Sequence, residues 1–539
     1  MRQLAEGGVR LLATTAGAAL LLAGSSAPSQ AQDANKTIRA VMQADVKVFD
    51  PIFNTADITS FHSMMVFDML FAMDKDLAAK PQMVGQWSLS EDGLTYTFTL
   101  RDGLKWHDGQ PVTAEDAVLS LKRWGVRDGA GQQLMKLTRD LAAVDAKTFK
   151  LTLSEPYGLV LDSFAKPSAN VAAMMPKRLA MTDPFQQIPD VIGSGPFKFA
   201  KEEWVPGSKI VYLKNTDYVP RAEPPSGIAG GKVAKADRVE WVVMPDPQTA
   251  ASALTRGEVD FFEQPPTDLL PMLRAAKGVK VETLNPLGTE GILRLNHLQP
   301  PFNNPKARQA VLWMVNQKDY LQAMIGDPQL MKVCGALLVC GSSMGSEAGA
   351  EALLSTLPEN ERIAKAKALL AEAGYKGELV VLLDPAERPR FHAANLVLAA
   401  AMKKAGINVQ IDAMDWGTLV TRRAKKEPPG QGGWSAFHTS SGGLEASNPA
   451  FHIAISAGCD KAWFGWPCDA EVEKLRTQWA LARSLPERQK VAEAIQKRAM
   501  EVVVYIPYGQ WSSPVAYRDT LKGLIAVPDS IVWWNVEKM

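Results

Sequence analysis

The sequence contains few cysteines, few histidines and no excess of charge of either sign. Its 539 residues include four cysteines, six histidines, 59 lysines and arginines, and 58 aspartates and glutamates. Balanced charge creates no electrostatic field that would steer the protein toward phosphate backbones or anionic lipid. We therefore expect that nucleic acid is not a partner.

The few histidines do not form a metal-binding pattern. No two of them are spaced as His-x3-His on a predicted helix, and no glutamate stands between two of them as in a zinc protease. We expect surface or core histidines, and neither a resident metal nor another cofactor.

Long hydrophobic runs are also scarce. One apolar run covers residues 11–24, after Arg2 and Arg10, and small residues follow at 29–31, where a signal peptidase would cut. The run is shorter than the roughly 20 residues that a membrane-spanning helix needs. We predict a removed signal peptide over residues 1–31 and a periplasmic location.

The cysteines form two close pairs, Cys334 with Cys340 and Cys459 with Cys468. An even number in an exported chain predicts two small disulfide-closed loops, although four cysteines allow three connectivities. A metal site is the alternative, but zinc sites have tighter spacing and histidine partners. Disulfides are the favoured interpretation.

The remaining sequence has the composition of a folded protein, with 46% hydrophobic and 22% charged residues. Its length predicts two or more domains. A hairpin is expected over 87–100 and a helix from Thr113, whose spacing to Asp116 resembles a capping box. A second helix should begin at Asn304, with Pro305 in its first turn, and a third should cover 359–373. A strand at 379–383, a helix at 391–404 and a strand at 408–414 indicate a parallel α/β unit.

One motif could indicate an enzyme. Residues 341–345, Gly-Ser-Ser-Met-Gly, match the G-x-S-x-G turn that presents a hydrolase nucleophile, here Ser343. That turn needs a strand before it and a helix after it, and residues 337–339 are too short for the strand. We favour a surface loop and a non-enzymatic protein, with a periplasmic hydrolase as an alternative.

Residues 94–118, LTYTFTLRDGLKWHDGQPVTAEDAV, closely resemble the signature of the family 5 extracellular solute-binding proteins, the peptide-binding components of ABC importers. Shorter similar segments follow the same order at 49–51, 193–197 and 254–260. The resemblance implies a monomeric α/β protein with a two-lobed clamshell fold, which captures a peptide-like or other medium-sized polar ligand and delivers it to a membrane permease. Residues 32–60, 190–290 and 505–539 would form the first lobe, 61–189 an extra subdomain of it, and 291–504 the second lobe.

The resemblance also suggests ligand-binding residues. Trp416 and Trp434 resemble family tryptophans that line side-chain pockets. Thr55 and Asp57 resemble a loop beside the bound ligand, and Asn296 would lie near the cleft.

The chain departs from the family at one important position. Peptide binders typically place an aspartate three residues after the second tryptophan, where it pairs with the peptide's amino group, whereas this chain has Phe437 and then His438. A buried ammonium group without an anionic partner costs several kcal/mol. We therefore expect weak binding of ordinary dipeptides, and consider Asp57 and Glu445 as replacement anchors. Phe437 and His438 could contact a different ligand, and a carrier of a metal chelate or haem is the second alternative.

Overall fold

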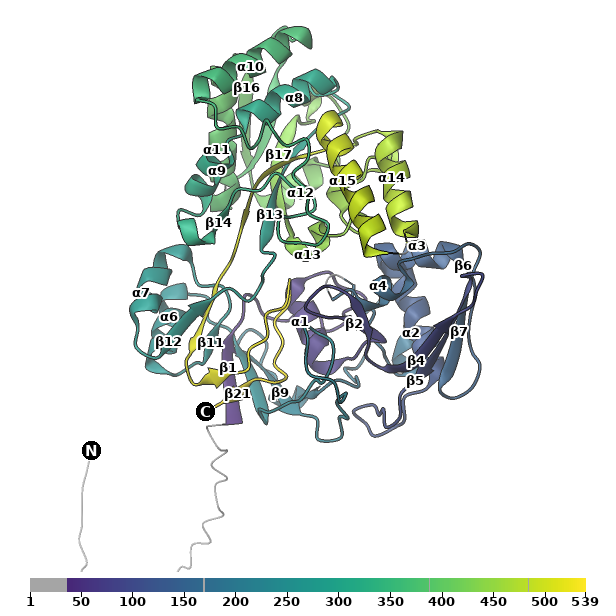
Figure 1. Cartoon of the computed structure of the whole chain (residues 1–539). Coiled ribbons are helices and arrows are strands. Elements are labelled where there is room, and N and C mark those ends of the chain that lie inside the picture. Colours follow the sequence, from purple (N-terminus) through teal and green to yellow (C-terminus); the bar gives the residue numbers. More distant parts are fainter. Residues whose placement is uncertain (1–35, 168–169, 387, 483) are drawn as a thin grey trace, which may run out of the picture. The chain divides into compact units, whose positions relative to one another are not determined.

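The computed structural model describes residues 36–167, 170–386, 388–482 and 484–539 (Figure 1). The predicted signal peptide lies outside these residues. Within these ranges, no helix has both the length and the apolar character needed to cross a membrane.

The first lobe is built on a seven-stranded sheet. Its strands, in spatial order, are β12 (Val279–Glu282), β19 (Val515–Arg518), β11 (Phe261–Phe262), β1 (Thr37–Val41), β10 (Arg238–Val242), β9 (Lys209–Lys214) and β8 (Phe197–Phe199). Strand β1 is parallel to β10 and β11, and β19 is antiparallel to β11. Other elements of this lobe are α1 (Asp57–Val66), α6 (Pro247–Arg256), α7 (Leu270–Ala275), β20 (Leu521–Lys522) and β21 (Glu537–Lys538). The lobe therefore combines segments from both ends of the described chain.

A four-stranded antiparallel sheet forms the centre of the subdomain. Its strands, in spatial order, are β4 (Val84–Leu89), β5 (Thr95–Leu100), β7 (Thr148–Leu153) and β6 (Thr138–Ala143). The subdomain also contains β2 (Phe71–Met73), β3 (Ala79–Pro81), α2 (Ala114–Arg127), α3 (Gly129–Leu137), α4 (Val160–Ala165) and α5 (Lys177–Ala180). The predicted hairpin is confirmed by the antiparallel pairing of β4 with β5. The capping box is also confirmed, because the Thr113 amide donates to Asp116 and the Asp116 amide donates to Thr113 Oγ1.

The second lobe is built on a six-stranded mixed sheet. Its strands, in spatial order, are β14 (Met331–Lys332), β18 (Ile506–Trp511), β13 (Thr289–Leu295), β17 (Ala436–Gly442), β15 (Val380–Pro385) and β16 (Val409–Met414). The longer helices are α8 (Pro305–Met314), α9 (Gln317–Met324), α10 (Glu359–Glu372), α11 (Pro389–Lys404), α14 (Ala470–Leu481) and α15 (Leu485–Val502). Two shorter ones are α12 (Trp416–Arg422) and α13 (Gly443–Ala446). Strands β15 and β16 are parallel and joined by α11, as predicted, and α8 and α10 confirm the helices predicted after Asn304 and over 359–373.

The chain crosses twice between the seven-stranded and six-stranded sheets. The first crossing follows β12 at residues 283–288, and the second follows β18 at 512–514. Because β18 pairs with β13, residues 506–511 lie in the sheet of the second lobe, whereas the sequence prediction places them in the first. Figure 1 shows the two crossings between the lobes, in teal and yellow.

Candidate functional site

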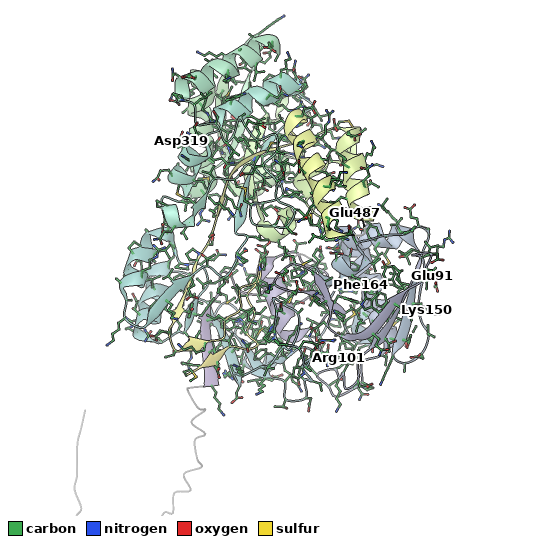
Figure 2. The ribbon with its side chains drawn as sticks, in the orientation of Figure 1. Glu91, Arg101, Lys150, Phe164, Asp319 and Glu487 are labelled. Atoms are coloured by element: carbon green, nitrogen blue, oxygen red, sulfur yellow. A yellow bond between two sulfur atoms is a disulfide. The ribbon has the colours of Figure 1, made fainter. Side chains whose placement is uncertain are left out.

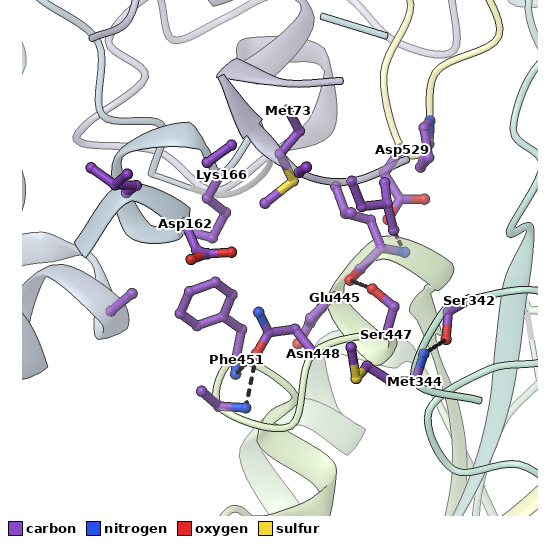
Figure 3. A pocket seen from close by; sticks show the side chains of 18 of the residues that line it. Met73, Asp162, Lys166, Ser342, Met344, Glu445, Ser447, Asn448, Phe451 and Asp529 are labelled. Atoms are coloured by element: carbon purple, nitrogen blue, oxygen red, sulfur yellow. Dashed lines mark hydrogen bonds between the residues drawn. The ribbon is translucent and has the colours of Figure 1, made fainter. Parts of the chain in front are cut away.

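A cavity of about 2540 Å³ is lined by both lobes and by the subdomain. Figure 2 shows the side chains of the described chain, and Figure 3 shows part of this cavity. Residues from the first lobe include Thr55, Asp57 and Glu263, and α13 of the second lobe contributes Glu445. The size suits a ligand larger than a typical drug-sized molecule, since most ligand pockets have roughly 300–1,000 Å³.

Asp57 is the first residue of α1 and is exposed to the solvent of the cavity. Thr55, two residues earlier, lines the same wall. The surrounding protein desolvates Asp57 and raises the pKa of its carboxyl group. Both residues therefore line the cavity, and their contact with a ligand stays a prediction.

Glu445 reaches the cavity from α13, the short helix that directly follows β17 (Figure 3). Burial raises the pKa of its carboxyl group, and the negative charge of Asp57 raises it further. The candidate anchor thus lies in the helix that follows β17, the strand that carries Phe437.

Two further carboxylates in the cavity were not identified from the sequence. Asp529 accepts hydrogen bonds from Asn285 Nδ2 at 2.8 Å and from the Leu444 amide at 3.0 Å. Burial, which is the largest cause, and the charges of Asp57 and Glu445 raise the pKa of Asp529 to about 6. Glu263 accepts from the Gln43 amide at 2.8 Å, and burial raises its pKa to about 8. Asp529 and Glu263 come from segments far apart in the sequence, so no local sequence pattern connects these two carboxylates.

The second lobe contacts the subdomain directly at the edge of the cavity. Arg488 of α15 donates to the Gly158 carbonyl oxygen at 3.0 Å, and its guanidinium lies 3.6 Å from the Asp162 carboxylate. A Cβ atom at Gly158 would come within 2.7 Å of the Ala480 carbonyl oxygen. The absence of a side chain at Gly158 therefore allows the lobes to approach this closely.

This contact leads to a prediction about the distance between the lobes. Replacing Gly158 with alanine should separate α14 from the subdomain, because a Cβ atom cannot occupy the same space as a backbone oxygen. Small-angle X-ray scattering should show a larger radius of gyration for the variant. Gly430→Ala is the matched control, since nothing lies within 4 Å of a Cβ atom there. An unchanged radius in Gly158→Ala would contradict the prediction.

Asn296 and Trp434 lie in the interior of the second lobe and do not line the cavity in this conformation. Trp434 is fully buried, and its indole Nε1 donates to the Arg423 and Lys425 carbonyl oxygens at 3.1 and 3.2 Å. Asn296 is also fully buried, and its Nδ2 donates to the Trp434 carbonyl oxygen at 3.0 Å. The two residues join β13 to the segment before β17.

Phe437 and His438 are also fully buried. The Phe437 ring packs edge-on against Trp434, with ring centroids 5.0 Å apart, in an aromatic and aliphatic cluster of the second lobe. His438 Nδ1 lies 2.9 Å from Asn395 Oδ1, and burial lowers the pKa of His438 to about 3. A neutral histidine with no exposed surface cannot reach a metal chelate or haem in this conformation.

Trp416 is half-buried at the start of α12 and does not line the cavity either. Its ring stacks on Phe391 at a centroid distance of 5.5 Å. Of the residues predicted to contact the ligand, the structure therefore brings Thr55, Asp57 and the candidate anchor Glu445 to the cavity, but not Asn296, Trp416, Trp434, Phe437 or His438.

Both predicted disulfides are present, Cys334–Cys340 and Cys459–Cys468. Residues 341–344, which line the cavity, directly follow the loop that the first disulfide closes. Ser343 lies in a turn that follows an isolated bridge at Cys340, not a strand, and no helix follows it directly. The context required by the hydrolase alternative is missing around Ser343.

The chain is similar to known proteins over nearly its whole length. The profile of the bacterial extracellular solute-binding proteins, family 5, matches residues 78–443. The peptide ABC transporter periplasmic-binding protein y4tO of Sinorhizobium fredii is 39% identical over 525 residues, 97% of each chain. The glutathione-binding protein GsiB of Pectobacterium atrosepticum is 28% identical over 375 residues, 68% of this chain and 67% of that protein.

Solved structures confirm the two-lobed α/β fold. The binding protein AgaA from A. tumefaciens R10, in complex with agropinic acid, has a TM-score of 0.74 at 22% identity and covers 93% of this chain and 99% of its own. The dipeptide-binding protein from Pseudoalteromonas sp. SM9913, in complex with Met-Leu, has a TM-score of 0.71 at 18% identity and covers 93% and 100%. Since the family profile covers more than half of the chain and a relative 39% identical spans almost all of it, the chain belongs to the family 5 bacterial extracellular solute-binding proteins.

Proposed function

We propose that this protein captures a peptide-like ligand in the periplasm and presents it to the permease of an ABC importer. The observation that carries this proposal is the 39% identity, over 97% of both chains, to a peptide ABC transporter periplasmic-binding protein. Family 5 solute-binding proteins are transport components, and we propose that this chain likewise performs no catalysis. The hydrolase and the carrier of a metal chelate or haem are not favoured.

The cavity provides the binding site in this proposal. It lies between segments of the two lobes, and the described chain joins these lobes by two crossings, so that ligand contacts with both lobes would favour their closed arrangement. We propose that Thr55 and Asp57 of the first lobe and Glu445 of the second contact the ligand. Asn296, Trp434, Phe437 and His438 would act indirectly, by fixing the interior of the second lobe.

Glu445 and Asp57 take the place of the missing aspartate as partners of a ligand ammonium group. Both line the cavity, whereas the side chain at position 437 packs in the lobe interior. An ammonium group that pairs with a carboxylate can leave water at a smaller cost than an unpaired one. The anchor has therefore moved from β17 to α13 and α1.

Exposure to a mixture of short peptides tests this function. The purified protein is incubated with a casein hydrolysate, separated from unbound peptides by gel filtration, and denatured to release what it retains. We expect about one peptide per protein molecule, identified by mass spectrometry, and a strong loss of retention in the double variant Asp57→Asn with Glu445→Gln. No retention above the level of that variant would contradict the proposal.

A further inference from the structure

On the basis of the function proposed above, we propose that the ligand carries at least two positive charges, which are held at separate points of the cavity by Asp57, Glu263, Glu445 and Asp529. Recognition would then select for cationic groups and not for peptide backbone alone.

Among the described residues that line the cavity, carboxylates outnumber cations. Four described cationic side chains line it, and each is ion-paired with a carboxylate that also lines it: Lys75 with Asp76, Lys166 with Asp128, Arg476 with Glu473 and Arg488 with Asp162. Six lining carboxylates have no ion-pair partner among the described residues, namely Asp57, Glu91, Glu155, Glu263, Glu445 and Asp529. Glu91 lies at the outer edge of the subdomain (Figure 2).

Asp57 lies close enough to three other carboxylates of the cavity to influence them. Burial is the largest cause of the raised pKa of Glu263, Glu445 and Asp529, the charge of Asp57 raises each of these pKa values further, and the charge of Glu445 also raises that of Asp529. The charge of Lys166 acts on Glu445 in the opposite direction, and the Lys166 ammonium group is ion-paired with Asp128 at 2.8 Å. Like charges at this range repel, so a cationic ligand relieves a cost that the empty cavity carries.

One metal ion cannot satisfy these carboxylates together. Among the described residues, the only three potential ligand atoms within 4.8 Å of one another belong to Cys334, Cys340 and Glu347, and the two cysteines are joined in a disulfide. The cavity carboxylates are spread more widely than a coordination sphere. Carboxylates that lie apart from one another can instead bind different positive charges of one extended ligand.

A buried hydroxyl group at the same wall provides independent evidence for a polar ligand. Ser530 is only 4% exposed and lines the cavity next to Asp529, and no described residue forms a hydrogen bond with its Oγ atom. A buried polar atom without a partner is unfavourable. An ammonium group has three N–H donors and no acceptor, so it can donate to a hydroxyl oxygen and to a carboxylate at the same time.

Apolar side chains line the same cavity as the carboxylates. Phe61, Leu444 and Phe451 line the same cavity, and Figure 3 shows Phe451 opposite Asp162. Lysine and arginine bury their methylene stems on apolar surface and place the charge at a polar point. The lining therefore suits a peptide with a basic side chain, or another amine with an aliphatic stem.

Calorimetry with three probes tests this inference on the full mature protein. Ala-Lys-Ala carries a second ammonium group, Ala-norleucine-Ala keeps the aliphatic stem without it, and spermidine has amines but no peptide bond. We expect Ala-Lys-Ala to bind at least tenfold more tightly than the norleucine peptide. The ratio should fall below about threefold in Asp57→Asn and in Glu445→Gln, and should persist in Glu361→Gln, which removes one exposed charge of α10.

The outcomes separate this inference from the proposed function. Equal affinity for the two tripeptides, or a ratio unchanged in both cavity variants, would overturn the inference and leave peptide capture intact. Binding of spermidine alone, with the same dependence on Asp57 and Glu445, would support the inference and contradict peptide capture. Absence of binding for all three probes would overturn the inference. Circular dichroism of each variant shows whether the fold is retained.

Discussion

Replacing Arg294 with methionine is expected to lower the free energy of unfolding by about 3 kcal/mol or more. Arg294 is fully buried in β13 and donates to four backbone carbonyl oxygens, those of Ala454, Trp463, Phe464 and Val504, at 2.5–3.2 Å. Methionine has a similar length but no donor, so four buried acceptors would lose their partner. Urea unfolding followed by tryptophan fluorescence measures the change.

The guanidinium of Arg294 tolerates burial because of these acceptors. Burial lowers its pKa to about 9, and its partners are carbonyl groups of three separate loops near the second lobe's sheet. Arg256→Met is the control, because Arg256 is exposed and pairs with Glu258 on the surface, where a pair contributes about 1 kcal/mol or less. If the Arg294 variant loses no more unfolding free energy than the Arg256 control, the buried guanidinium does not stabilise the second lobe through these carbonyl groups.

Acidification should weaken the binding of a doubly charged amine, by about tenfold or more between pH 7.5 and pH 5.5. The pKa of Asp529 is raised to about 6 and that of Glu263 to about 8, and those of Asp57 and Glu445 are also raised. A cation binds the ionised form, so each carboxyl group that is protonated at low pH must first release a proton. Calorimetry with Ala-Lys-Ala across this pH range measures the effect.

The raised pKa values of these four carboxyl groups also predict that the stability of the ligand-free protein changes with pH in the direction opposite to the affinity for the amine. A carboxyl group whose pKa is higher in the folded state than in the unfolded state binds more protons when folded, so it destabilises the fold as the pH rises. Stability should therefore fall from pH 5 to pH 8 while affinity for the cation rises.

The groups that face Asp529 determine how steep this change is. They are the Asn285 amide and the Leu444 backbone N–H, with the charges of Asp57 and Glu445 nearby. Lys166 opposes the effect at Glu445, because its positive charge lowers the Glu445 pKa. Asp529→Asn should flatten both curves near pH 6, and unchanged curves in that variant would assign the titration to other groups.

Local elements were predictable from the sequence because their signals are local. The capping box at Thr113 and the strand–helix–strand unit over 380–414 depend on neighbours within a few residues, and both are present. The disulfide between Cys334 and Cys340 could also be predicted from the sequence, because the close spacing of the two cysteines limits their possible partners. Residues 506–511 were misplaced because membership of a sheet depends on long-range pairing with β13.

The site was predictable only in part. Asp57 and Glu445 were considered because a ligand ammonium group needs an anion, and both line the cavity. Glu263 and Asp529 carry no sequence signal, because they become neighbours only through the sheet of the first lobe and the C-terminal segment. Trp434 illustrates the converse: an aromatic residue in a ligand-binding family can be a core residue whose indole N–H is satisfied by backbone carbonyl groups.

Native mass spectrometry shows directly whether one ligand molecule binds among the carboxylates of the cavity. The protein and its Asp57→Asn/Glu445→Gln variant are each incubated with the casein hydrolysate and sprayed from ammonium acetate at pH 7.5. We expect a single one-to-one adduct on the unmodified protein and on Glu361→Gln, and its loss from the cavity variant. An adduct of equal abundance on all three proteins, or none on the unmodified protein, would show that the ligand does not bind among these carboxylates.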